Sequence, residues 1–197
     1  VGAYLDQYYS TQSGSVYVFT RSGDLWTQQQ KLRGSDTAAG DMFGVSVSVS
    51  GDTLLVGAYG DYDAGSLSGS AYVFTRSGSV WTQQQKLVAT YPRPNNYFGW
   101  SVSLSGDTAF IGAHGDDVTD NNTGAAYFFK RSGNVWTALP RVIPDDGARS
   151  DSFGHSVSIS GDTAVAGSHE DDDGGSSSGS AYIFTCVDGT TWTQIGR

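Results

Sequence analysis

The sequence predicts an all-β protein of the β-propeller class, and three observations lead to this fold. A unit of 55 residues recurs in register along the 197-residue chain. Each unit contains short segments in which apolar and polar residues alternate, which is the pattern of β-strands. No segment repeats its apolar residues with the 3.6-residue period of a helix. A four-stranded unit repeated in tandem is typical of propeller blades, which bury their faces by stacking on one another.

The repeat is defined by landmarks that share one period. They are the tryptophans Trp26, Trp81, Trp136 and Trp192, the tyrosines Tyr17, Tyr72, Tyr127 and Tyr182 of Tyr-x-Phe, and the Phe-Gly pairs that begin at Phe43, Phe98 and Phe153. Every spacing is 55 residues, except that one extra residue precedes the last tryptophan. Independent landmarks in one register indicate true internal repetition.

One complete unit predicts four strands. The first is 43–50, where Phe and Val alternate with Gly and Ser, and a Gly-Asp turn joins it to the second, 53–59. An acidic, glycine-rich loop leads to the third strand, 70–76, and a short turn leads to the fourth, 80–87. We expect the Phe/Val face of the first strand to pack against one neighbouring blade, and its Ser/Gly face to let the other approach closely.

The chain begins within a second strand and ends within a fourth. We therefore expect fifteen strands, with one innermost strand missing, in a single propeller or a segment of a larger one. The predicted blades are 1–40 (partial), 41–95, 96–150 and 151–197. Further blades from the parent chain, or self-association, are expected to cover the open blade faces, because exposed faces of this kind aggregate.

Large aromatic residues are expected to hold the blades together. The predicted structural anchors are Trp26, Trp81, Trp136, Trp192, Phe43, Phe98 and Phe153. Each Trp is expected to fix the outer strand to the Tyr and Phe of the third strand. The alternative is a row of Trp rings that stack on sugars.

Composition and charge narrow the function. The net charge of −9 repels backbone phosphates, so nucleic acid is not an expected partner. No apolar stretch approaches 18 residues, so no membrane insertion is expected. Cys186 is the only cysteine and has no internal disulfide partner. Few Lys and many Ser, Thr, Gly and Asn residues favour an extracellular or cell-surface protein.

The segments FGVSVSVSGDT, GSAYVF and WTQQQKL resemble the FG-GAP repeats of integrin α-subunit propellers, in their short subtype. The resemblance covers nearly the whole chain and implies a propeller, an extracellular setting, and a role in adhesion or recognition. Integrin-type blades that bind calcium carry a D-x-D-x-D-G loop, whereas SGDT stands here, with a single carboxylate at Asp52, Asp107 or Asp162. One carboxylate does not provide the six to eight oxygens that calcium needs, so this site does not carry over.

A second set of acidic residues lies in the loop between the second and third strands. Calcium is the one cofactor considered, and its candidate ligands are Asp61, Asp63, Asp116, Asp117, Asp120, Asp171, Asp172 and Asp173. Clustered carboxylates on glycine-rich loops are suited to calcium. The alternative is a solvated acidic rim that aids solubility.

The three histidines show no metal-binding motif. His155 lies in a first strand, where a core or inter-blade role is expected. His114 and His169 share one register in different blades, and such a pair does not define a zinc site.

The sequence favours an extracellular FG-GAP propeller that mediates adhesion or protein recognition through rim loops, with a protein or glycan ligand at the cell surface. A structural subunit of a surface appendage or filament is one alternative, and a carbohydrate-binding propeller is another. No catalytic residues are identified, and we do not expect an enzyme.

Overall fold

The computed structural model describes residues 1–7, 11–117 and 122–197, and within them it contains fifteen strands and no helix. The strands form four antiparallel sheets, here named blades 1 to 4, each built from consecutive strands. Blade 1 has three strands and the others have four, so the all-β fold, the fifteen strands and the missing innermost strand are confirmed. None of the described segments forms a helix with the length and hydropathy that crossing a membrane requires.

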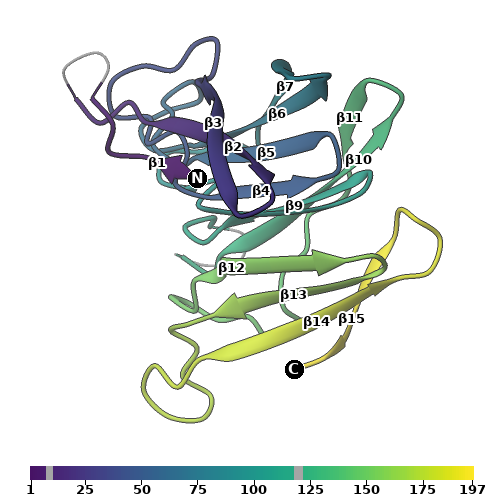
Figure 1. Cartoon of the computed structure of the whole chain (residues 1–197). Coiled ribbons are helices and arrows are strands. Elements are labelled where there is room, and N and C mark those ends of the chain that lie inside the picture. The colour runs from purple at the N-terminus through teal and green to yellow at the C-terminus, as the bar shows by residue number, and fades with distance from the viewer. Residues whose placement is uncertain (8–10, 118–121) are drawn as a thin grey trace.

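The strands follow the predicted repeat closely. Blade 1 contains β1 (Gly2–Ala3), β2 (Ser15–Ser22) and β3 (Leu25–Leu32); blade 2 contains β4 (Val47–Ser50), β5 (Thr53–Ala58), β6 (Ser70–Ser77) and β7 (Val80–Leu87); blade 3 contains β8 (Ser101–Ser105), β9 (Thr108–Ala113), β10 (Ala125–Ser132) and β11 (Val135–Ala138); blade 4 contains β12 (Phe153–Ser160), β13 (Thr163–Ser168), β14 (Ser180–Cys186) and β15 (Trp192–Gly196). Figure 1 shows the blades in chain order, with blade 4 at the lower edge.

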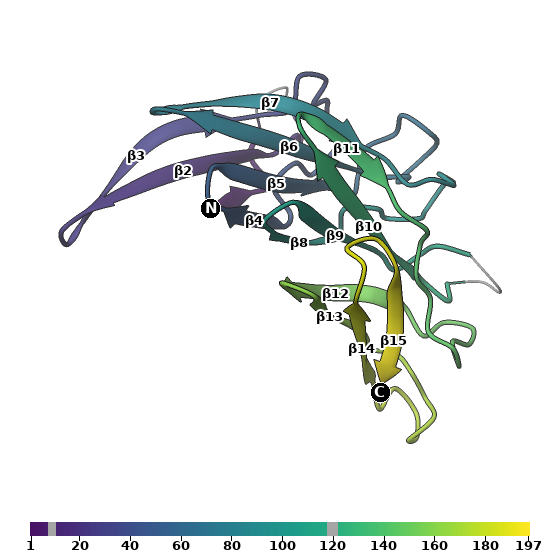
Figure 2. The same ribbon diagram turned by 90° about the vertical axis from the view of Figure 1, so that its right-hand side faces the viewer.

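The blades fan out with their first strands on the inside. Figure 2 shows β4, β8 and β12 towards the inner side and β3, β7, β11 and β15 towards the outside. β8 packs against β4 on one side and β12 on the other. Neighbouring inner strands therefore belong to different sheets, and each presents one edge that no strand of its own blade covers.

Serine side chains satisfy these inner edges. The hydroxyl oxygens of Ser46 and Ser48 in blade 2 accept hydrogen bonds from the backbone N–H groups of Val102 and Leu104 in blade 3, each at 3.0 Å. Equivalent bonds run from Gly106 to Ser50, from Ile159 to Ser103 and from Gly161 to Ser105. The small face of the first strand thus does more than admit a neighbour, because it pairs the backbone donors of the next blade.

The Phe-Gly and Gly-Ala motifs meet at the same boundary. Gly99 of blade 3 has φ +86°, and its carbonyl oxygen would lie 1.9 Å from a Cβ placed on Gly57 of blade 2. Gly112 and Gly154 repeat this contact between blades 3 and 4. In blade 2 the equivalent Gly44 has φ +93°, and the inner strand begins at Val47 and not at the predicted residue 43.

Apolar side chains from adjacent blades form three core clusters. In each, the buried Phe of the Phe-Gly pair packs edge-on against the Tyr and Phe of its own blade's third strand. Phe98, for example, lies 5.3 Å from Tyr127 and 6.1 Å from Phe129, measured between ring centroids. The opposite face of the preceding blade closes each cluster, as Leu55 and Val73 do here. The predicted anchors Phe43, Phe98 and Phe153 are fully buried in these clusters.

Trp81 and Trp136 are buried as predicted, but each is also held by glutamines of the preceding blade. The backbone N–H and C=O of Trp81 bond to the side-chain amide of Gln30, at 2.8 and 3.0 Å. Its indole N–H donates to Gln29 at 3.2 Å. Gln84 and Gln85 bind Trp136 in the same way. The WTQQQ segments therefore join one blade to the next.

The anchoring role predicted for Trp26 is wrong, since this side chain is 61% exposed whereas Trp81 is 5% exposed. No described blade packs on the face of blade 1 that carries it. Trp192 differs in another way, because Leu139 and Pro140 replace the glutamines that would face it. It stacks instead on Phe128 of blade 3, with ring centroids 4.1 Å apart and planes inclined by 3°.

We predict that Ser103→Ala destabilises the protein by about 1–2 kcal/mol, because the N–H of Ile159 loses its partner at a blade boundary. Ser158→Ala is the matched control, since Ser158 has the same register in blade 4 and is exposed. Its effect should stay within about 0.5 kcal/mol. Urea unfolding of both variants measures the difference, and equal effects would contradict the role given to the serine bonds.

Candidate functional site

The acidic loops and the loops that precede the first strands lie at the same end of the blades. We call this end the loop face; it comprises the described parts of 33–46, 59–69, 88–100, 114–124, 139–152 and 169–179. The two kinds of loop are joined across blade boundaries. The backbone N–H groups of Asn95 and Tyr97 donate to the carbonyls of Ser66 and Leu67, at 2.8 and 3.0 Å. The predicted metal ligands that the structure describes, which are all of them except Asp120, belong to this face.

Asp61 is a buried structural residue and not part of a solvated rim, with an exposed fraction of 3%. Its carboxylate accepts hydrogen bonds from the hydroxyls of Ser70 and Tyr72, at 2.8 and 3.0 Å. Its other oxygen accepts the backbone N–H of Asp63 at 3.0 Å. The carboxylate thus ties the acidic loop to the third strand of the same blade.

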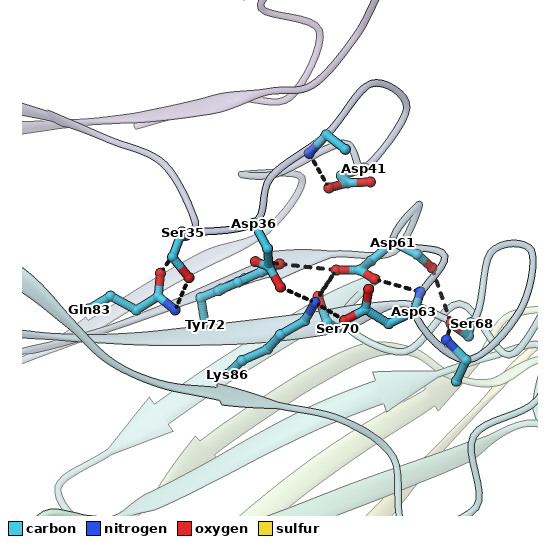
Figure 3. A network of polar contacts seen from close by, with 12 residues as sticks. Ser35, Asp36, Asp41, Asp61, Asp63, Ser68, Ser70, Tyr72, Gln83 and Lys86 are labelled. Carbon is cyan, nitrogen blue, oxygen red and sulfur yellow. Dashed lines mark hydrogen bonds and ion pairs between the residues drawn. The ribbon is translucent and has the colours of Figure 1, made fainter. Parts of the chain in front are cut away.

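A lysine lies at the centre of this network (Figure 3). The ammonium nitrogen of Lys86 is 2.7 Å from carboxylate oxygens of both Asp36 and Asp61, and 2.5 Å from one of Asp63. Among the described residues, these three carboxylates are also the one group of potential metal ligands whose oxygens lie close enough together to share an ion. Burial alone would raise the pKa of Asp61, but its hydrogen bonds, first that with Lys86, outweigh this and hold the pKa below the usual value.

Blade 4 repeats the arrangement with arginine. The guanidinium of Arg197 lies 2.7 Å from Asp146, 2.7 Å from Asp171 and 2.5 Å from Asp173. The hydroxyl of Tyr182 donates to Asp171 at 2.7 Å. Asp36, Asp61 and Asp63 correspond in register to Asp146, Asp171 and Asp173. We call these two groups the cation-centred clusters.

Blades 1 and 3 carry smaller forms of the cation-centred cluster, in which the basic residue pairs with a single aspartate. In blade 1, Lys31 pairs with Asp6 at 2.6 Å, and the hydrogen bond from Lys31 lowers the pKa of Asp6 to about 2. In blade 3, the hydroxyl of Tyr127 donates to the buried Asp116, but Arg141 is 3.6 Å away. Burial therefore dominates and raises the pKa of Asp116. Arg141 lies over the ring of Tyr91, which replaces the first aspartate of the other clusters, at 4.8 Å from its centroid.

The remaining candidate ligands are scattered. Asp117 accepts the backbone N–H of Asn122 at 2.6 Å, Asp172 is exposed, and Asp120 lies outside the described residues. The SGDT loops do not fit calcium either, because Asp52 accepts from Arg76 at 2.8 Å and Asp107 from Arg131 at 2.6 Å. Calcium binding at the loop face stays a prediction. The position it would take in blades 2 and 4 holds a basic side chain of the protein itself.

The basic residues that complete the clusters were missed by sequence reasoning, although a signal existed. Lys31, Lys86, Arg141 and Arg197 occupy one register of the repeat. A basic residue recurring at that position, opposite an aspartate that recurs in each acidic loop, is the pattern that would have indicated an internal ion pair.

The structure also gathers the three histidines, which the sequence had left apart. They line a pocket on the loop face between blades 3 and 4, here named the histidine pocket, together with Tyr97, Trp100 and Glu170. The ring centroids of His114 and His155 are 5.4 Å apart, and those of His155 and His169 are 4.0 Å apart. His155 is indeed an inter-blade residue. His114 and His169, which share one register in different blades, both lie beside His155, because β12 packs against β9 of blade 3 and pairs with β13 of its own blade.

Two aromatic rings form the wall of the histidine pocket on its blade 3 side. Tyr97 stacks on His114, with centroids 4.9 Å apart and planes inclined by 7°, and the Trp100 ring lies 4.7 Å from His114. Burial first, and then the nearby His155 and His169, lower the pKa of His114 to about 4. Burial and His169 also lower the pKa of His155. Both imidazoles are therefore neutral at pH 7.

We predict that Lys86→Met destabilises the protein by about 2 kcal/mol, because three converging carboxylates lose their only shared cation. Lys31→Met is the control, since Lys31 pairs with one carboxylate and its loss should cost less than about 1 kcal/mol. Thermal melting in millimolar calcium and in chelator completes the test. Calcium should raise the melting temperature of the Lys86 variant and leave that of the wild type unchanged, because Lys86 fills the space between the carboxylates in the wild type. Equal stabilisation of both proteins by calcium would place the ion elsewhere on the loop face.

Comparison with known families agrees with the repeat. The family model described as the FG-GAP repeat matches residues 26–74, 81–129 and 136–184. Each match runs from the fourth strand of one blade to the third strand of the next, and so spans the boundary at which Phe-Gly, Gly-Ala and Trp meet. A comparison with curated proteins finds none that matches the chain. The three matches cover most of its length, and the chain belongs to the FG-GAP repeat family, whose repeats here build the blades of a β-propeller.

Proposed function

We propose that this propeller is an extracellular recognition module, which binds a protein partner in adhesion through its loop face and catalyses no reaction. Tandem FG-GAP repeats suggest a propeller-type protein-interaction module. Loops carried on a rigid scaffold are the usual place for binding residues. The net charge of −9 favours a partner whose contact surface is basic or neutral.

One observation carries this proposal: aromatic side chains gather on the loop face. Tyr59, Tyr97 and Trp100 contact one another, with Tyr59 and Trp100 centroids 4.8 Å apart. Tyr62 and Tyr91 on the adjoining loops are exposed. Tyrosine and tryptophan dominate the energetics of protein interfaces, because they bury large areas and lose little conformational entropy.

The loops that carry these rings are held in place before any partner binds. Hydrogen bonds join the loop of blade 2 to the loop that leads into blade 3, as described above. Leu67, Asn95 and Tyr97 take positive φ values of 55°, 63° and 54°, and such backbone conformations persist only where the surrounding contacts impose them. Binding to a preorganised surface avoids much of the entropic cost of ordering it.

We predict that the double variant Tyr62→Ala and Tyr91→Ala loses adhesion. Beads coated with the protein and incubated with cells of the organism that produces it provide the measurement. Val80→Ala with Val135→Ala is the matched control, because these exposed side chains lie at the opposite end of the blades. Undiminished adhesion of the tyrosine variant would contradict the proposal. Protease treatment of the cells should abolish adhesion, whereas loss on glycosidase treatment alone would favour the carbohydrate-binding alternative.

A second candidate function is self-assembly into a filament, favoured by two complementary open faces. Phe19 and Trp26 of blade 1 are exposed, whereas Phe74 and Trp81 in the same register are buried against the preceding blade. Blade 4 exposes Val165 and Ile183 on the face that, in blade 2, buries Leu55 and Val73 beneath blade 3. A second copy of the chain would repeat between molecules the interface already present between blades, in head-to-tail order.

If the protein self-assembles, we predict that sedimentation velocity will detect oligomers whose size increases with protein concentration. Trp26→Ser should shift the protein towards the monomer, because it removes an aromatic ring from one of the two faces. Val88→Ser is a control at an exposed apolar residue outside both faces. A monomer at every concentration would contradict self-assembly and leave the recognition proposal standing.

A further inference from the structure

The histidine pocket collects more imidazole groups than packing requires. In the register of His114 and His169 the other blades carry Tyr4 and Tyr59, so a tyrosine is compatible with this position in the fold. His155 likewise stands where Val45 and Trp100 lie in blades 2 and 3. Only at the boundary between blades 3 and 4 are all three positions histidine, and there the rings lie side by side.

The pocket also contains a ring nitrogen that has no partner within the described part of the chain. The Nδ1 atom of His114 is buried and has no hydrogen-bond partner among the described residues. A buried polar atom left unpaired is unfavourable, and a bound ligand would remove this cost. The carboxylate of Glu170 lies 3.7 Å from Nε2 of His169 and accepts a hydrogen bond from Ser152 at 3.1 Å.

We propose that the histidine pocket binds a divalent transition-metal ion of the class that prefers imidazole ligands, such as Zn²⁺, Ni²⁺ or Cu²⁺, through His114, His155 and His169. Three histidines and one open or carboxylate position form a recognised ligand set for such ions. Glu170 is placed to provide that carboxylate. The inference does not rest on the proposed recognition function.

The spacing of the rings supports a shared ion after one side chain moves. Two histidines on one tetrahedral ion have ring centroids roughly 5 Å apart, because each metal–nitrogen bond is about 2 Å long. The 5.4 Å between His114 and His155 agrees with this, whereas the 4.0 Å between His155 and His169 must increase. The donor atoms of the three rings do not yet lie within 4.8 Å of one another, as those of Asp36, Asp61 and Asp63 do. The side chain of His169 is 50% exposed, so its ring is free to turn.

The chemistry of the pocket selects among ligands. Its described lining contains no lysine or arginine, so it offers no fixed positive charge to an anion. Calcium and magnesium prefer oxygen ligands and would gain little from three imidazoles.

Isothermal titration of the whole chain with Zn²⁺, and separately with Ca²⁺, tests the proposal. We expect one Zn²⁺ per chain, and a tetrahedral absorption spectrum when Co²⁺ replaces it. His169→Tyr installs the residue that blades 1 and 2 carry at this register and should fold normally. It should weaken Zn²⁺ binding at least about tenfold. His155→Ala should do the same, and Glu170→Gln should weaken binding less.

Asp63→Asn is the matched control, because it alters the cation-centred cluster of blade 2 and not the histidine pocket. It should leave Zn²⁺ affinity unchanged. The proposal is overturned if the wild type takes up no Zn²⁺ in a 1:1 ratio, if His169→Tyr binds Zn²⁺ as the wild type does, or if Asp63→Asn abolishes binding. The last result would place the ion among the carboxylates.

Discussion

The structure depends on pairing the backbone N–H groups at the free edge of each inner strand, the edge that no strand of the same blade covers. β8 and β12 each have one edge without a strand partner from their own blade, and an unpaired buried N–H is costly. Serine hydroxyls of the preceding blade accept these hydrogen bonds, because every second residue of its inner strand is Ser and the N–H groups that need partners also occur at every second residue. The alternation therefore has two purposes: its large residues fill the core between blades, and its small polar residues close the open edge of the neighbouring sheet.

A second set of polar contacts stabilises the loop face. Lys86 and Arg197 each draw three aspartates together, and these aspartates come from the acidic loop and from the loop that leads into the blade. These carboxylates are thus engaged in internal ion pairs, although one cation against three carboxylates leaves each cluster negatively charged. The aromatic rings and the histidine pocket are the features that distinguish one part of the face from another. The binding proposals then concern two boundaries: the aromatic rings gather where blades 2 and 3 meet, and the histidine pocket lies where blades 3 and 4 meet.

Periodicity was enough to predict the fold, because landmarks such as Phe43, Phe98 and Phe153 recur in one register and each strand alternates visibly. Contacts between blades were not predictable in the same way. Gln30 binds Trp81, and Ser103 binds Ile159, although the partners are separated by 51 and 56 residues in the sequence. Only the stacking of one blade on the next brings them together. The histidine pocket escaped prediction for the same reason, since its residues lie in separate repeats. Trp26 shows the converse limit: its repeat position predicts burial, but burial needs a neighbouring blade on its face.

Residue-resolved hydrogen exchange of the inner-strand amides tests most directly the claim that serines close the edges of the sheets. The N–H groups of Val102 and Leu104 are bound by serines, whereas Val47 and Val49, in the same register of blade 2, are exposed beside the incomplete blade 1. We predict that Val102 and Leu104 exchange many-fold more slowly than Val47 and Val49 under native conditions. Equal exchange rates at the two sets of amides would contradict the account.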